Sequence, residues 1–112
     1  MILKDRVCIV CGASRGIGRA SALAIAAAGA AVVVASRDLT ACEQLAREIS
    51  ATGGRARAFT ADVTIAADME ALVAFTEREF GGLDLAFNNA GAIFGTASIV
   101  ETPAERFRAQ LE

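Results

Sequence analysis

The sequence predicts an α/β fold with a doubly wound parallel sheet. Short apolar segments rich in β-branched residues alternate with longer segments whose apolar residues recur at helical spacing. Three glycines, Gly12, Gly16 and Gly18, crowd the junction between the first apolar segment and the first helical one. Alternation of this kind favours β-α-β units with right-handed crossovers. We therefore expect the N-terminal half of a Rossmann-type sheet, β-α-β-α-β-α-β, with strand order 3-2-1-4.

Four segments are predicted to be strands. Residues 7–10 are apolar up to the glycine loop, and residues 31–35 read AVVVA, as expected of a strand that is buried on both faces. Residues 56–60 and 83–87 supply the third and fourth strands. In this four-stranded sheet the fourth strand would be an edge, although it is apolar and Asp84 is its only edge protection. We therefore expect its place to be in the middle of a longer sheet.

Three helices follow the first three strands. Residues 17–28 are rich in alanine, and a second helix runs from Leu39 to the glycines at 53 and 54. Thr40 followed by Glu43 suggests a capping box at its start, and Asp38 also suits a helix start. One face of the third helix is marked by Met69, Leu72, Val73, Thr76 and Phe80.

The C-terminal residues predict the start of a fourth helix. Thr102 would be its capping residue, Pro103 would take the first helical position, and Glu105 follows three residues after the cap.

Composition excludes several kinds of function. The chain has 112 residues, 54% of them hydrophobic, and a net charge of −2, so we expect one domain over residues 1–112 and no nucleic-acid groove. No apolar run approaches the ~20 residues of a membrane span. Three cysteines make a poor disulfide framework, which favours a cytoplasmic location. There is no histidine, so neither a Ser-His-Asp triad nor a histidine-ligated zinc site is predicted, and nothing in the sequence suggests an all-cysteine or carboxylate metal site.

Cys8 and Cys11 form a C-x-x-C pair with two possible interpretations. A redox pair needs both sulfurs on one side, usually at a helix start. On a strand, residues three apart point to opposite faces of the sheet. The pair lies on the first predicted strand, which favours two buried thiols.

The glycine loop, CGASRGIG over residues 11–18, lies where a dinucleotide-binding loop belongs, between a strand and a helix. A helix N-terminus offers unpaired N–H groups and partial positive charge to a pyrophosphate, and glycines let the backbone approach it closely. The alternative is a tight turn without a ligand.

Three motifs together resemble the short-chain dehydrogenase/reductase family. The loop CGASRGIGRA is similar to the family's T-G-x-x-x-G-x-G, with Cys11 in place of threonine. Asp62-Val63 follows the third predicted strand, and NNAG, residues 88–91, follows the fourth. The resemblance covers the whole chain, and the family's full domain is more than twice as long, which implies an N-terminal portion of an oxidoreductase.

The resemblance implies a site for a nicotinamide dinucleotide. Its phosphates would be lined by Gly12, Ser14, Arg15, Gly16, Ile17 and Gly18. Asp62 would accept a hydrogen bond from the adenine amino group, and Val63 would contribute its backbone. The ribose on the nicotinamide side would lie beside Asn89, Ala90 and Gly91.

Arg37 favours NADP as the cofactor. The second predicted strand ends at Ser36, where an NAD-specific site usually has an acidic residue. A guanidinium binds a 2′-phosphate through two parallel hydrogen bonds, and Arg15 would add a second positive charge. Asp38 keeps NAD possible, although it falls two positions later than the usual acidic residue. Both arginines would otherwise be solvated surface residues.

No catalytic residue is predicted within this chain. The family's proton donor is the tyrosine of a Tyr-x-x-x-Lys motif, and the chain has no tyrosine and only Lys4 as a lysine. The resemblance implies a homo-oligomeric parent enzyme that moves hydride between the cofactor and a carbonyl or alcohol substrate, with these 112 residues inactive alone. The alternatives are a non-catalytic dinucleotide-binding module and a domain for another nucleotide, such as an adenosine-containing methyl donor.

Overall fold

The computed structural model describes residues 2–88 and 100–103. A five-stranded sheet has the order β3-β2-β1-β4-β5, in which the first four strands are parallel. The elements are β1 (Val7–Cys11), α1 (Gly16–Ala27), β2 (Ala31–Ser36), α2 (Leu39–Ala51), β3 (Arg55–Thr60), α3 (Ala66–Phe80), β4 (Leu85–Asn88) and β5 (Val100–Pro103). The α/β class and the predicted order 3-2-1-4 are confirmed.

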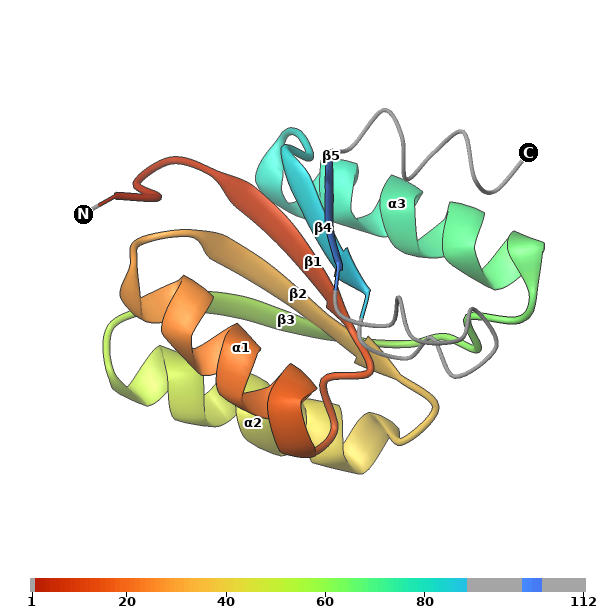
Figure 1. The fold of residues 1–112 in the computed structure, drawn as a ribbon, viewed down its shortest axis with the longest axis horizontal. Helices are drawn as coiled ribbons and strands as arrows, with labels where there is room; N and C mark the ends of the chain where they lie inside the picture. The colour runs from red at the N-terminus through yellow and green to blue at the C-terminus, as the bar shows by residue number, and fades with distance from the viewer. Residues whose placement is uncertain (1, 89–99, 104–112) are drawn as a thin grey trace.

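Helices cover both faces of the sheet, with α1 and α2 on one side and α3 on the other (Figure 1). Each face has its own apolar cluster. The α1/α2 cluster is centred on Val10, Val32 and Leu45, and the α3 cluster on Ile9 and Leu72. Strand β1 is buried along its whole length, and so is β2 up to its last residue, as their apolar sequences predict.

The two cysteines of the C-x-x-C pair lie on opposite faces of the sheet. Cys8 belongs to the α1/α2 cluster and Cys11 to the α3 cluster. Both are buried and form no disulfide within the described residues, and the same holds for Cys42 on α2. The prediction of two buried thiols is confirmed, because alternation along β1 separates their side chains.

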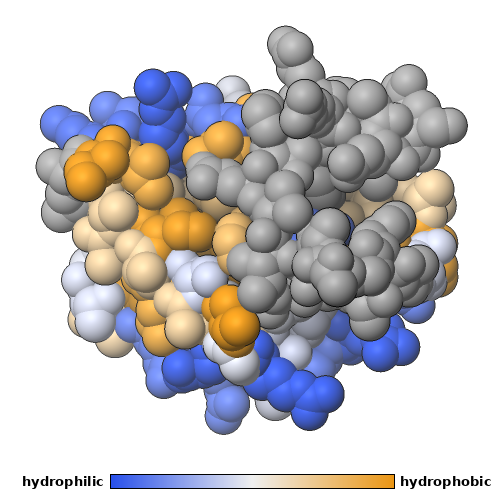
Figure 2. Space-filling model, viewed as in Figure 1, coloured by the Kyte–Doolittle hydropathy of each residue, from blue (hydrophilic) through white to orange (hydrophobic). Residues whose placement is uncertain are grey.

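The outer surfaces of α1 and α2 differ in polarity. On the face seen in Figure 2, hydrophilic residues line the lower margin, over α2, and apolar residues gather to the left, over the N-terminal segment and α1. Helix α2 exposes Glu43, Arg47 and Glu48, whereas α1 exposes Ala20 and Ala24.

The capping box predicted at Thr40 and Glu43 is wrong, whereas the helix start suggested for Asp38 is confirmed. Asp38 is the N-cap, and its carboxylate Oδ1 accepts a hydrogen bond from the N–H of Ala41 at 3.1 Å. Thr40 lies inside the first helical turn. A carboxylate at the N-cap also interacts favourably with the positive end of the helix, which explains why the helix begins at Leu39.

The predicted fourth helix start is also wrong. Thr102 and Pro103 lie in β5, which pairs antiparallel with β4 so that Pro103 stands opposite Leu85. Threonine is β-branched and suits a strand, and proline is tolerated at the end of an outermost strand, where its missing N–H leaves no ladder position empty. Glu105 lies outside the described residues. Strand β4 is therefore flanked on both sides and is not an edge.

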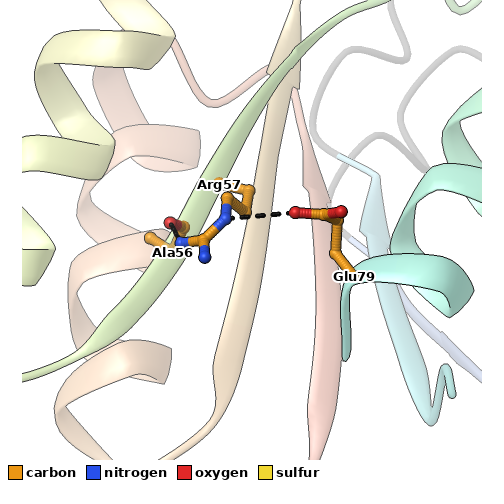
Figure 3. A network of polar contacts seen from close by, with 3 residues as sticks. All are labelled: Ala56, Arg57 and Glu79. Atoms are coloured by element: carbon orange, nitrogen blue, oxygen red, sulfur yellow. Dashed lines mark hydrogen bonds and ion pairs between the residues drawn. The ribbon is translucent and has the colours of Figure 1, made fainter. Parts of the chain in front are cut away.

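The opposite edge of the sheet, β3, carries charged residues. Figure 3 shows Arg57 reaching from β3 towards Glu79 on α3. Its Nε donates to Glu79 Oε1 at 3.2 Å, and its Nη1 donates to the carbonyl oxygen of Ala56 at 3.0 Å. The same guanidinium lies 5.8 Å from the centre of the Phe80 ring. Arg57 thus ties the edge strand to α3 and discourages pairing with another chain.

Candidate cofactor site

The carboxyl ends of the four parallel strands meet along one edge of the sheet. Cys11, the last residue of β1, stands opposite Ala35 of β2 on one side and Asn88 of β4 on the other. The chain leaves β1 through α1 to β2 on one side, whereas the connection from β3 through α3 brings it to β4 on the other side. Such a switch point is where ligands bind in doubly wound sheets.

The glycine loop leaves β1 and is fastened to β2. The N–H groups of Gly12 and Ala13 both donate to the carbonyl oxygen of Ala35, at 2.9 and 3.3 Å. Gly12 and Gly16 have φ angles of +72° and +64°, which side chains rarely tolerate. The loop therefore needs glycine at both positions to turn from the strand into α1.

The N-terminus of α1 has no partner for its polar groups in the described part of the chain. Arg15 is its N-cap and makes no side-chain capping bond, and the first turn has no acidic residue. Among the described residues, none accepts a hydrogen bond from the N–H groups of Gly16, Ile17 or Gly18. By contrast, Asp38 caps α2. An anion fits the uncapped end of α1.

The side chains of the loop take different positions around this helix end. Gly18 is buried, which allows close packing of α1 on the sheet, and Ser14 is partly buried. Arg15 is exposed, and Ile17 is 55% exposed although it is apolar. The loop thus presents one cationic and one apolar side chain to solvent beside the helix end.

The end of β2 presents Arg37 on a turn held by its neighbours. The hydroxyl of Ser36 accepts a hydrogen bond from the N–H of Asp38 at 3.0 Å and lies 3.2 Å from Cys42 Sγ. Asp38 uses its carboxylate to cap α2. Arg37 is exposed. The position that follows β2 therefore offers a guanidinium, while the carboxylate of the next residue, Asp38, is engaged with the helix backbone.

The end of β3 holds Asp62 in a fixed orientation. Its Oδ1 accepts hydrogen bonds from the N–H of Thr64 at 2.9 Å and from the Thr64 hydroxyl at 2.6 Å. Its own N–H donates to Asp68 Oδ2 at 2.9 Å. The bonds from Thr64 hold the pKa of Asp62 below its usual value, and the positive charge of Arg37 lowers it further. The charge of Arg37 therefore acts on the Asp62 carboxylate, although the two residues are 25 positions apart in the sequence.

Val63, next to Asp62, packs its side chain against the α3 cluster. Asn89, Ala90 and Gly91, the remaining predicted site residues, lie outside the described residues. The sequence reasoning missed Thr64 and Asp68. The Asp-x-Thr spacing could have identified Thr64, because an aspartate often accepts hydrogen bonds from the residue two positions later in a turn. No feature of the neighbouring sequence identifies Asp68 as a partner of Asp62.

None of the helices in the described residues is long and apolar enough to cross a membrane. The same residues contain no group of three or more acidic, cysteine or histidine side chains placed to hold a metal ion.

Comparison with known proteins identifies the family. The family model described as short chain dehydrogenase matches residues 6–112. The chain belongs to the short-chain dehydrogenase/reductase family. This agrees with the resemblance read from the glycine loop, Asp62-Val63 and NNAG.

Two curated family members are similar along nearly all of this chain. A cyclohexanol dehydrogenase from Acinetobacter sp. (strain SE19) is 40% identical over 93% of the chain and 41% of its own length. A 2,5-dichloro-2,5-cyclohexadiene-1,4-diol dehydrogenase from Sphingobium indicum is 40% identical over 98% of the chain and 43% of its own length. The chain thus spans about two fifths of the length of these relatives.

Solved structures of family members superpose on the same region. A hydroxysteroid dehydrogenase from Escherichia coli matches with a TM-score of 0.77 and 37% identity, over 80% of this chain and 38% of the other. A metagenomic short-chain oxidoreductase in complex with NADP matches with a TM-score of 0.76 and 36% identity, over 81% and 41%.

Proposed function

We propose that this chain is the NADP(H)-binding part of a short-chain oxidoreductase that transfers hydride between the nicotinamide and a carbonyl or alcohol carbon. The uncapped, acid-free N-terminus of α1 carries the proposal. The N–H groups of Gly16, Ile17 and Gly18 have no acceptor within the described residues. They lie at the switch point of the sheet, in a turn that the positive φ angles of Gly12 and Gly16 shape. A pyrophosphate satisfies both the N–H groups and the helix dipole.

Arg37 supports NADP over NAD. Ser36 ends β2, and the next acid along the chain, Asp38, is engaged in capping α2. An exposed guanidinium at Arg37 would bind the 2′-phosphate in a bidentate manner, with Arg15 at the N-cap of α1 as a second cation. The relative solved with NADP belongs to the same family.

The remaining contacts are assigned by family membership and the placement of the strands. Ser14, Ile17 and the loop glycines would lie along the phosphates. Asp62 would accept from the adenine amino group, with Val63 presenting its backbone, since its side chain is engaged in the core. Asn89, Ala90 and Gly91, which follow β4, would lie beside the ribose on the nicotinamide side.

When bound, the cofactor would supply the hydride, and the residues named above would hold and orient the cofactor. Proton transfer to the substrate would need a general acid, which in this family is a tyrosine, and this chain contains no tyrosine. We therefore expect the 112-residue chain to bind NADPH without turning over a carbonyl substrate. The whole protein would act as a homo-oligomer.

Fluorescence titration of the full chain with NADPH and NADH tests the proposal. Arg37→Ala should weaken NADPH binding by roughly 10- to 100-fold, the cost of a lost charge-assisted bidentate contact, and leave NADH binding nearly unchanged. Arg55→Ala, an exposed arginine at the opposite end of the strands, is the matched control. Failure of the wild-type chain to bind either dinucleotide would make the glycine loop a turn without a ligand. Equal loss of both would show that Arg37 does not recognise the 2′-phosphate.

A further inference from the structure

We propose that Thr64 is a positioning residue that fixes the Asp62 carboxylate towards the 6-amino group of adenine, and that it thereby makes the site select adenine over bases with an oxygen at that position. This inference rests on the proposed function and adds a specificity determinant to it.

Thr64 occupies one oxygen of the Asp62 carboxylate and leaves the other open. Both the N–H and the hydroxyl of Thr64 donate to Oδ1, at 2.9 and 2.6 Å. No described residue donates to Oδ2. Two donors on one oxygen fix the rotation of the carboxylate, so Oδ2 has a set direction and unused lone pairs.

The backbone that carries Asp62 is held as well. The N–H of Ala61 donates to the carbonyl oxygen of Ser36 at 3.0 Å, which fastens the end of β3 to the end of β2. The N–H of Asp62 donates to Asp68 Oδ2 at 2.9 Å, which fastens it to the first turn of α3. Since main chain and carboxylate are both restrained, the open oxygen is preorganised and needs no reordering when a ligand binds.

The chemistry of a fixed carboxylate gives the selectivity. An ionised carboxylate only accepts hydrogen bonds. It can therefore accept a hydrogen bond from the amino group of adenine. It is repelled by the carbonyl oxygen of hypoxanthine, because both groups are hydrogen-bond acceptors. A carboxylate free to rotate turns away from that oxygen at little cost. The hydroxyl of Thr64 should therefore control the difference in affinity between the two bases more than the affinity for the dinucleotide as a whole.

The test compares the binding of NADPH with that of its deaminated analogue, in which hypoxanthine replaces adenine. Fluorescence titration of the wild-type chain should show NADPH binding roughly tenfold more tightly, the value of one charge-assisted hydrogen bond. Thr64→Val removes the hydroxyl and keeps the backbone N–H, and should reduce this ratio to about threefold or less. Thr64→Ser retains the hydroxyl and should retain the wild-type ratio. Thr64 is exposed, so neither substitution disturbs the core.

Thr52→Val is the matched control. The Thr52 hydroxyl donates to the carbonyl oxygen of Ile49 at 2.9 Å, at the far end of α2 from the site. This variant loses a comparable hydrogen bond, and its base ratio should equal that of the wild type. A wild-type ratio in Thr64→Val, or a wild type that binds both dinucleotides equally, overturns the role of Thr64 and leaves the proposed function standing. A wild type that binds neither overturns both.

Discussion

Asp84 and Val7 hold each other by two hydrogen bonds. The N–H of Val7 donates to Asp84 Oδ2 at 2.8 Å, and the N–H of Asp84 donates to the carbonyl oxygen of Val7 at 2.9 Å. The pair lies one residue before the first register pair of β1 and β4, Cys8 with Leu85. Asp84 therefore closes the amino-terminal end of the hydrogen-bonded ladder between β1 and β4, in addition to placing a charge at the start of β4.

Asp84→Ala should lower the free energy of unfolding by about 1–2 kcal/mol, because the N–H of Val7 loses a charged acceptor in a partly buried place. Arg6 also contacts this carboxylate, with Nη1 3.6 Å from Oδ1, but the pair is exposed. Arg6→Ala is therefore the control, with an expected cost below about 0.5 kcal/mol. Urea denaturation measures both. Equal costs in the two variants would contradict the assignment of the stabilisation to the backbone contact.

Gly16 and Gly53 offer a matched pair for testing the phosphate loop. Their φ angles are +64° and +90°, and a Cβ at either position would meet no atom within 4 Å. Alanine at each position should therefore destabilise the fold by a similar ~1–2 kcal/mol through backbone strain alone. Only Gly16 lies at the proposed phosphate site. We expect Gly16→Ala to weaken NADPH binding by about tenfold or more, or ~1.4 kcal/mol, and Gly53→Ala to leave it unchanged.

Thermal melts separate the two effects in this pair. Similar melting temperatures with different NADPH affinities would support the site. Equal affinities would show that the space beside Gly16 is not used by the cofactor. Gly54→Ala gives a third reference, because its Cβ would lie 2.7 Å from Ile49 Cγ2 and should cost more stability than either.

The buried cysteines should resist modification in the folded protein. Burial raises the pKa of Cys11 to about 12, with a smaller contribution from Cys8, and burial also raises the pKa of Cys42. At pH 8 only roughly one Cys11 in ten thousand is then a thiolate, the form that reacts. Mass spectrometry after treatment with iodoacetamide should find the native thiols unmodified and all three modified in denaturant. Rapid labelling of the native Cys8 and Cys11, or a disulfide between them, would contradict the opposite-face arrangement.

The sheet could be predicted because buried strands and helices have recognisable patterns of apolar residues in the sequence. AVVVA, residues 31–35, has no polar position, so it fits only a strand covered on both faces, and the structure buries all five. The apolar spacing of Met69, Leu72 and Val73 similarly placed α3 on the sheet. Both features depend only on nearby residues and on the spacing of apolar positions, so they can be recognised without knowing which distant residues are in contact.

The error at Thr102-Pro103 and the missed role of Asp68 arose where a distant partner decides the structure. Thr102-Pro103 suits a helix start or the end of an edge strand, and only pairing with β4 distinguishes them. Asp68 belongs to α3 by sequence, yet its carboxylate restrains the N–H of Asp62 after β3. A single sequence does not reveal such contacts, because neither residue departs from what its own helix or strand requires.

Asp62 should remain ionised to lower pH than an ordinary aspartate. The hydrogen bonds from Thr64 are the main cause of its lowered pKa, and the positive charge of Arg37 makes the smallest contribution. The folded-state pKa of Asp62 lies below its unfolded-state pKa. The contribution of the ionised Asp62 to the stability of the fold is therefore complete above the unfolded-state pKa, and it is lost as the pH falls through the folded-state pKa. Thr64→Val should raise the pKa of Asp62 towards its usual range, and Arg37→Ala should raise it less. Carboxyl-carbon NMR titration of the three proteins measures this order. A larger rise in Arg37→Ala than in Thr64→Val would show that charge, and not the Thr64 hydroxyl, sets the state of this carboxylate.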